Sequence, residues 1–116
     1  MFTGYVISAC LLAAIVGFSG AGKLAENEQV VASLTRAAVP MSWYRPLAAL
    51  EFAGAAGLLI GLLYRPLGIA AGIGLVLYFI GAVAAHVRAK DLQGAPGPAV
   101  LLAASAATVV FGLATV

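Results

Sequence analysis

Four long apolar stretches, separated by short polar segments, dominate the pattern of the chain. A helix needs about 20 mostly apolar residues to cross a hydrocarbon core of about 30 Å. Because every backbone polar group must be satisfied inside a bilayer, each stretch is predicted to be a helix. We predict an all-α fold, an integral membrane four-helix bundle that forms a single domain over residues 1–116. The predicted spans cover residues 2–22, 46–64, 67–86 and 98–116.

The segments between the spans indicate how the spans are joined. Residues 64–66 form a minimal hairpin, so the second and third spans are expected to be antiparallel neighbours. Residues 27–38 carry apolar and polar positions with helical periodicity and are followed by Pro40. We expect a short amphipathic helix there, lying in the membrane interface, with an ordered loop packed on the bundle as the alternative. An interfacial anchor at the headgroup level is predicted next, formed by Trp43, Tyr44 and Arg45.

The composition excludes a water-soluble domain. Of the 116 residues, 64% are hydrophobic and 9% are charged, and the mean hydropathy is +1.11. Soluble domains contain about 45–50% apolar and about 25% charged residues. The net charge of +2, with no run of basic residues, gives no reason to expect nucleic-acid binding. The first stretch lacks the basic start of a signal peptide and is too long for its apolar region, so a cleaved leader is the weaker alternative.

The basic residues predict the orientation of the chain in the cell membrane. One side, which holds the segments 24–45 and 87–97, carries five basic residues, whereas the other side carries only Arg65. By the positive-inside rule the side with five is cytoplasmic, so both termini of this multi-pass protein lie outside. The five residues are Lys23, Arg36, Arg45, Arg88 and Lys90.

Small residues indicate where the helices pack closely. Lipid supplies no hydrophobic drive for helix association, so helices in a membrane approach one another through small residues. His86 shares a helix face with Gly72 and is expected to point into the bundle. These faces are expected to be used within the bundle or to form a homodimer. The glycines assigned to helix packing are Gly20, Gly54, Gly57, Gly61, Gly68 and Gly72.

The side chains present exclude several kinds of chemistry. His86 is the one histidine, so a haem held by two histidines cannot form. The chain cannot easily assemble three or four Cys, His or carboxylate ligands for a metal, and Cys10 has no second cysteine to pair with. We therefore expect no haem and no metal, and the sequence identifies no catalytic residue.

Glu51 is an ionisable residue inside a predicted span. A charged carboxylate in hydrocarbon costs about 2.5–3.5 kcal/mol on insertion scales, so it normally faces the bundle interior and has a partner. The predicted topology puts Lys23, His86 and Arg88 in the same leaflet, and we predict a ligand-binding or ion-pair cluster of these three residues with Glu51. Two interpretations stay open: a cluster that fixes the helix register, and a polar cavity for a proton, a quinone head group or another small ligand.

Motifs in three regions resemble the DoxX-like family of small four-helix membrane proteins. Residues 19–24 are similar to its small-residue ending of helix one followed by Lys-Leu, and residues 50–59 to its Glu-containing second helix. The chain departs from the family at residues 37–40, where Ala-Ala-Val-Pro replaces a common Leu-Gly-x-Pro turn. The resemblance implies a four-helix bundle that often associates with membrane redox complexes. The third region resembles the end of helix three and the start of helix four, in Gly81, Ala82, His86, Arg88, Asp91 and Pro98.

The shortage of catalytic side chains favours a non-catalytic role. Our first expectation is an accessory or assembly subunit of a membrane complex, with a membrane-protein partner and a link to quinones. The alternative is an oxidoreductase component that binds a quinone or another small lipophilic ligand in a pocket with Glu51 and His86. A small proton-coupled multidrug transporter is the third interpretation, which is disfavoured because the first span carries no carboxylate.

Overall fold

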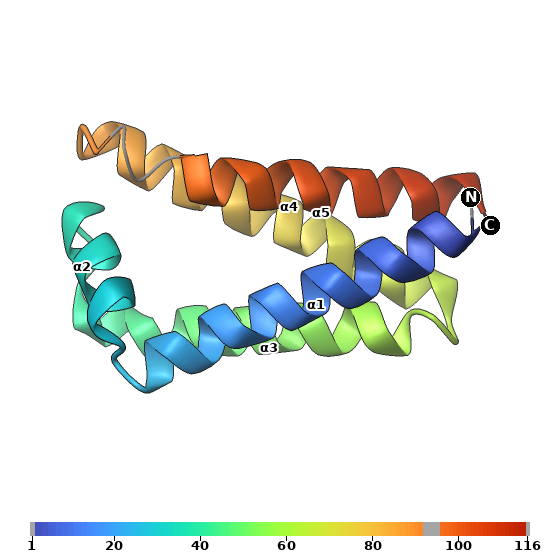
Figure 1. Ribbon diagram of the computed structural model, residues 1–116, viewed down its shortest axis with the longest axis horizontal. Coiled ribbons are helices and arrows are strands. Elements are labelled where there is room, and N and C mark those ends of the chain that lie inside the picture. Colours follow the sequence, from blue (N-terminus) through green and yellow to red (C-terminus); the bar gives the residue numbers. More distant parts are fainter. Residues whose placement is uncertain (1, 92–95, 116) are drawn as a thin grey trace.

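A computed structural model of the protein describes residues 2–91 and 96–115, and Figure 1 shows how its helices are arranged. Four long helices pack along one another, and a short helix lies across one end. No strand occurs in the described part of the chain. The elements are α1 (Phe2–Leu24), α2 (Glu28–Arg36), the 3-10 turn η1 (Met41–Trp43), α3 (Tyr44–Ile60), α4 (Arg65–Arg88) and α5 (Pro96–Ala114).

The long helices form two closely packed pairs, α1 with α3 and α4 with α5. In Figure 1 the pairs approach each other near the two termini and spread apart toward the end that carries α2. At the terminal end the guanidinium of Arg65 lies 4.6 Å from the ring centroid of Tyr5, and its Nη1 donates to the Gly112 carbonyl at 3.2 Å. These contacts join α1, α4 and α5 at this end of the bundle, whereas the two helix pairs are apart at the end that carries α2.

Within the described residues, three helices are long and apolar enough to cross a membrane: α1, α4 and α5. Large apolar side chains such as Phe18, Leu63 and Leu77 are exposed on the outside of the bundle. The interior combines buried apolar side chains such as Leu12 and Leu58 with the polar Ser105 and Thr108. The Ser105 and Thr108 hydroxyls donate to carbonyls one turn back in α5. An apolar exterior around a partly polar interior suits a lipid environment.

The connection between α3 and α4 differs from the predicted hairpin. The second span was expected to continue to Tyr64, but α3 ends at Ile60 and residues 61–64 form turns. Helix α4 then begins at Arg65, ahead of the predicted start at residue 67, with Pro66 in its first turn. Proline fits there because its missing N–H is one that the first turn leaves unpaired anyway. The two helices still pack against each other as antiparallel neighbours.

The short helix α2 is two residues shorter at its end than the predicted segment 27–38. Asn27 is its cap, because the Asn27 side chain accepts a hydrogen bond from the Gln29 amide at 3.0 Å. The helix stops at Arg36 because Ala38 adopts a left-handed conformation with φ of 61°, and the Val39 amide bonds back to the Leu34 carbonyl. A left-handed residue at the end of a helix is usually glycine. Because this chain has alanine at that position, the sequence carries no signal for the end of α2.

The six glycines assigned to packing all lie at close approaches between helices. A Cβ built on Gly61 would lie 2.2 Å from the Cα of Gly68, so α3 and α4 meet backbone to backbone at this point. Added Cβ atoms at Gly54 and Gly57 would likewise meet side chains of α4, at 2.6 and 2.7 Å. A Cβ built on Gly20 would lie 3.2 Å from the Phe52 ring, and Cβ atoms built on Gly68 and Gly72 would lie 2.2 Å from Tyr5 and 2.7 Å from Val109. These faces are used within the chain.

Candidate functional site

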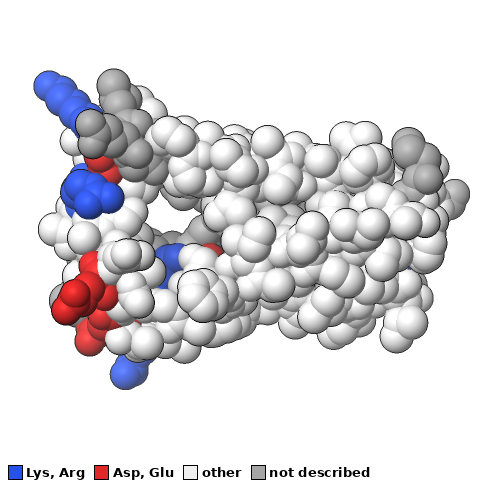
Figure 2. All heavy atoms as spheres, viewed as in Figure 1, with Lys and Arg blue, Asp and Glu red and all other residues white. Residues whose placement is uncertain are grey.

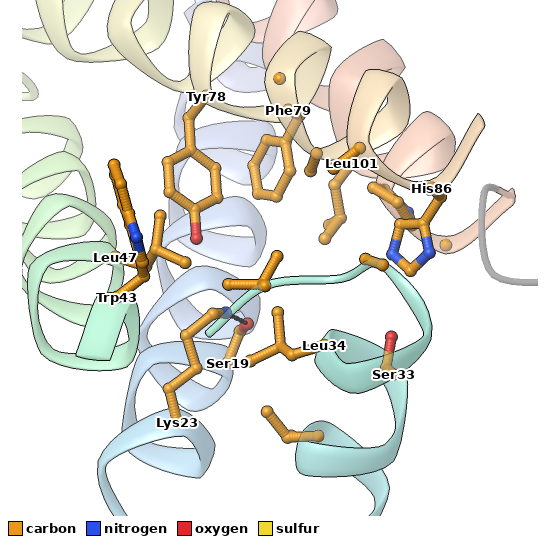
Figure 3. A pocket seen from close by; sticks show the side chains of 18 of the residues that line it. Ser19, Lys23, Ser33, Leu34, Trp43, Leu47, Tyr78, Phe79, His86 and Leu101 are labelled. Atoms are coloured by element: carbon orange, nitrogen blue, oxygen red, sulfur yellow. Dashed lines mark hydrogen bonds between the residues drawn. The ribbon is translucent and has the colours of Figure 1, made fainter. Parts of the chain in front are cut away.

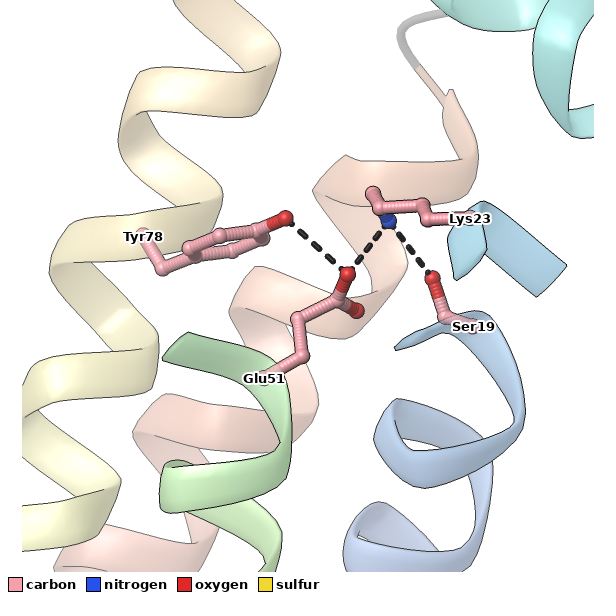
Figure 4. Close-up of polar contacts among 4 residues, drawn as sticks. All are labelled: Ser19, Lys23, Glu51 and Tyr78. Atoms are coloured by element: carbon pink, nitrogen blue, oxygen red, sulfur yellow. Dashed lines mark hydrogen bonds and ion pairs between the residues drawn. The ribbon is translucent and has the colours of Figure 1, made fainter. Parts of the chain in front are cut away.

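A buried ion pair joins α1 to α3 near the widening of the bundle. The Lys23 ammonium, in the last turn of α1, contacts Oε1 of Glu51, whose side chain has no exposed surface. The Tyr78 hydroxyl of α4 donates to the same oxygen at 3.0 Å, and Lys23 also donates to the Ser19 hydroxyl at 3.0 Å. Figure 4 shows this Ser19–Lys23–Glu51–Tyr78 network, which draws side chains from three helices to one carboxylate oxygen.

Helix geometry explains why these side chains meet. Ser19 and Lys23 are four residues apart, so they lie on one face of α1. Glu51 shares the inward face of α3 with Ala48 and Leu58, which are both fully buried. The absence of a side chain at Gly20 lets α3 approach α1 closely, and this brings the carboxylate to the lysine. Packing of small residues thus sets the geometry of the network.

The second oxygen of Glu51 has a different environment. Oε2 is buried, and no donor in the described part of the chain reaches it. A buried polar atom without a partner costs free energy comparable to a lost hydrogen bond, and such atoms are rare in stable folds. Oε2 therefore has room in its hydrogen bonding for one further donor.

A cavity of about 980 Å³ lies beside this network, between the spread ends of the long helices and α2. Ser19, Lys23 and Tyr78 form part of its wall, and Figure 3 shows them around the interior space together with Trp43, Leu34 and His86. Most of the remaining wall is apolar. The volume falls at the upper end of small-molecule sites, which are commonly about 300–1,000 Å³ and mostly apolar with a few placed polar groups. Figure 2 shows a hollow on the molecular surface near the charged end of the bundle.

The predicted cluster of four residues divides into separate groups. Lys23 contacts Glu51, whereas the Nδ1 of His86 pairs with Asp91 at 2.9 Å, and Asp91 also accepts from Nε of Arg36 at 3.3 Å. His86 is buried and lines the cavity, as its helix face predicted.

The fourth member of that cluster is also placed apart from the carboxylate. Arg88 is exposed at the end of α4, on the cavity rim. Of the three basic partners predicted for Glu51, the structure brings Lys23 to it. His86 and Arg88 lie in the last turn of α4, whereas the α4 residue that reaches the carboxylate is Tyr78, about two turns earlier.

The prediction that Trp43, Tyr44 and Arg45 form one interfacial anchor needs correction for Tyr44. Tyr44 is 3% exposed and points into the bundle, whereas Trp43 and Arg45 are exposed. These residues lie in consecutive positions of a helical turn, where neighbouring side chains diverge by about 100° and cannot share one face. Trp43 forms part of the cavity wall. It therefore belongs to the site itself.

Sequence reasoning missed Tyr78, although a signal was present. A tyrosine in the middle of an apolar span carries a hydroxyl that must find a partner when it is buried. Tyr78 stands next to Phe79, on a face adjacent to the one that was followed from Gly72 to His86. Pairing each isolated polar group of one span with those of the other spans would have connected it with Glu51.

The described residues contain no group of three or more His, Cys, Asp or Glu side chains that could hold a metal ion. The site offers instead an ammonium, hydroxyls and an imidazole around an apolar space. These groups can bind and orient a molecule through hydrogen bonds.

The chain was compared with known proteins. Searches of curated proteins and of solved structures found no match. Residues 7–108, which include every member of the network and all the residues that line the cavity, match the model of the DoxX-like family. With three helices able to span a membrane and a match over most of its length, the chain is an integral membrane protein that belongs to the DoxX-like family.

Proposed function

We propose that this protein binds a small lipophilic molecule in the cavity at the charged end of the bundle. The observation that carries the proposal is the cavity of about 980 Å³, whose mostly apolar wall is interrupted by Lys23, Ser19 and Tyr78. Apolar walls suit a lipid-soluble body, and the small polar group suits one polar end. A quinone has this shape, with a ring carbonyl for the polar end and an apolar tail.

We propose further that α3 is a fourth membrane span. Its 17 residues are about 26 Å long at 1.5 Å per residue, close to the hydrocarbon thickness. It packs between α1 and α4, so it occupies the same depth as these longer helices. Helix α2, which has no buried residue, would then lie in the membrane interface beside the opening of the cavity. A lipophilic ligand could reach the site from the bilayer without crossing water.

The orientation inferred from basic residues places the cavity in the cytoplasmic leaflet. The proposal predicts that reporters fused after Val116 are active only outside the cytoplasm. A C-terminal reporter that works only in the cytoplasm would reverse the orientation, although it would leave the ligand site unchanged.

The single tryptophan provides the binding assay. Trp43 lies in the cavity wall, so a benzoquinone with a decyl tail should quench its fluorescence saturably in protein reconstituted into nanodiscs. Ala85 also lines the cavity, whereas its neighbour Ala84 is exposed and does not. Ala85→Phe should weaken binding about tenfold, because overpacking a site costs about 1–3 kcal/mol.

The matched control is Ala84→Phe, which adds the same side chain on the lipid side of α4. It should leave quenching unchanged. Quenching that never saturates, or that responds equally to the two substitutions, would mean that the quinone reaches Trp43 from the lipid and not in the cavity.

An accessory role in a membrane complex is compatible with ligand binding and stays a prediction. Isolation in mild detergent tests it, since an accessory subunit should bring its membrane partner with it. A homodimer also stays a prediction, but it would need a surface other than the glycine faces, because these pack within the chain.

A further inference from the structure

The charged groups on the cavity wall have one sign. Lys23 and Arg88 line the cavity together with His86, whereas no Asp or Glu belongs to its described lining. Two carboxylates contact these wall residues from outside the described lining: Glu51, with no exposed surface, pairs with Lys23, and Asp91, 10% exposed, pairs with His86. A molecule inside the cavity therefore meets basic side chains directly, whereas the carboxylates lie behind them.

The network also leaves unused hydrogen-bond donors on two residues that line the cavity, Lys23 and Ser19. An ammonium group has three N–H donors, and the contacts of Lys23 with Glu51 and Ser19 use two of them. The Ser19 hydroxyl accepts from Lys23, and within the described residues its own hydrogen has no acceptor assigned. The Tyr78 hydroxyl already donates its hydrogen to Glu51. Lys23 and Ser19 thus offer adjacent donors to one acceptor atom.

We infer that the polar end of the ligand is an oxygen that accepts hydrogen bonds, either a neutral carbonyl or a carboxylate, and that lipophilic cations are excluded. This inference rests on the proposed ligand site and names the chemistry of its ligand. Lys23 donates to the oxygen with the help of its charge, and Ser19 supplies the second hydrogen bond. Glu51 does not touch the ligand and acts as a positioning residue, which holds Lys23 and Tyr78 in place.

Exclusion of cations follows from the same geometry. A cation in the cavity would face Lys23 directly, and like charges brought together cost several kcal/mol in affinity. The Glu51 side chain has no exposed surface, so a cation could reach its carboxylate only by moving the side chains that cover it. A proton-coupled transporter of cationic drugs needs a membrane carboxylate that its substrate can approach, so this arrangement argues against the transporter interpretation.

Four probes that each carry a ten-carbon chain, the carboxylate carbon of decanoate included, separate these possibilities: decanoate, decyl benzoquinone, decyltrimethylammonium and decane. Each is titrated into the full chain in nanodiscs, with Trp43 fluorescence and competition against the quinone as readouts. Decanoate and the quinone should bind at least about tenfold more tightly than the ammonium probe. The ratio of decanoate to quinone affinity then tells whether the oxygen is charged or neutral.

Lys23→Met provides the sharper test because it removes the donor and leaves the Glu51 carboxylate as a negative charge without its cation beside the cavity. Binding of decanoate should fall about tenfold or more, and binding of the ammonium probe should appear. Lys90→Met removes an exposed lysine that does not line the cavity and should change neither affinity.

Two failures are distinguishable. If the unmodified chain binds the ammonium probe as tightly as decanoate, the inferred ligand chemistry is wrong and the cavity remains a ligand site. If no probe binds, the proposed function itself is wrong. Because the comparison of the four probes uses the unmodified chain, it decides the matter even where Lys23→Met fails to fold.

Discussion

Removing the partner of a buried charge should be more harmful than removing the whole pair. Lys23→Met leaves Glu51 fully buried with the Tyr78 hydroxyl as its remaining described donor. Breaking a buried ion pair by deleting one partner costs about 3–5 kcal/mol. Replacing both partners with neutral groups of similar volume is often close to neutral. Gln in place of Glu51 keeps the shape and an oxygen that accepts from Tyr78.

The double variant Lys23→Met/Glu51→Gln should therefore recover about 2 kcal/mol of the stability that Lys23→Met loses. The assay is unfolding of the purified protein in detergent by titration with a denaturing surfactant, followed by circular dichroism. Lys90→Met, at an exposed position, should change stability by less than about 0.5 kcal/mol. If the double variant is no more stable than Lys23→Met alone, the pair is not coupled in the membrane fold and the reasoning fails.

Two further predictions concern packing and the short helix. Gly61→Ala should destabilise the protein by about 1–3 kcal/mol, because its Cβ would lie 2.2 Å from the Cα of Gly68. Gly74→Ala, where nothing lies within 4 Å of the added atom, should be neutral or stabilising by about 1 kcal/mol through helix propensity; equal thermal stability of the two variants would contradict the close approach. Arg36→Ala removes the ion pair to Asp91 and should lower stability by less than about 1 kcal/mol, because the Arg36 side chain is 56% exposed. It should nevertheless speed hydrogen exchange of α2 amides, and unchanged exchange would show that this pair does not hold α2.

The helical architecture could be predicted from the sequence because its signals are strong. Apolar stretches of about 20 residues can only be helices in a bilayer, and small residues mark their close contacts. Glu51 was identified as inward-facing for a related reason, since lipid cannot solvate a carboxylate. These constraints act on each helix separately, so they can be read from one stretch of sequence at a time.

The arrangement of the site could not be predicted in the same way. Which basic group meets Glu51 depends on how far α4 slides along α3, and this is set by the contact of Gly61 with Gly68 and not by hydropathy. That register brings Tyr78 to the carboxylate and leaves His86 with Asp91. The cavity was likewise hidden, because it arises from the spreading of two helix pairs that are joined at their other end.

The ends of α2 and α3 were misjudged for local reasons. Left-handed residues that end helices are usually glycine, but this chain uses Glu26, Ala38 and Lys90 for such positions. Helix α3 stops at Ile60 in the middle of an apolar run, where composition gives no signal. Boundaries of this kind depend on backbone hydrogen bonds that a hydrophobic pattern does not report.

Occupation of the cavity by a lipophilic molecule is tested most directly by photolabelling. An alkyl ketone with a diazirine on its tail is irradiated with the full chain in nanodiscs, and labelled residues are mapped by mass spectrometry. We predict labels at wall residues such as Leu34, Leu47 and Phe79, which excess decyl benzoquinone suppresses. Labels confined to lipid-facing residues such as Phe18 and Leu63, and unaffected by the competitor, would contradict a ligand site in the cavity.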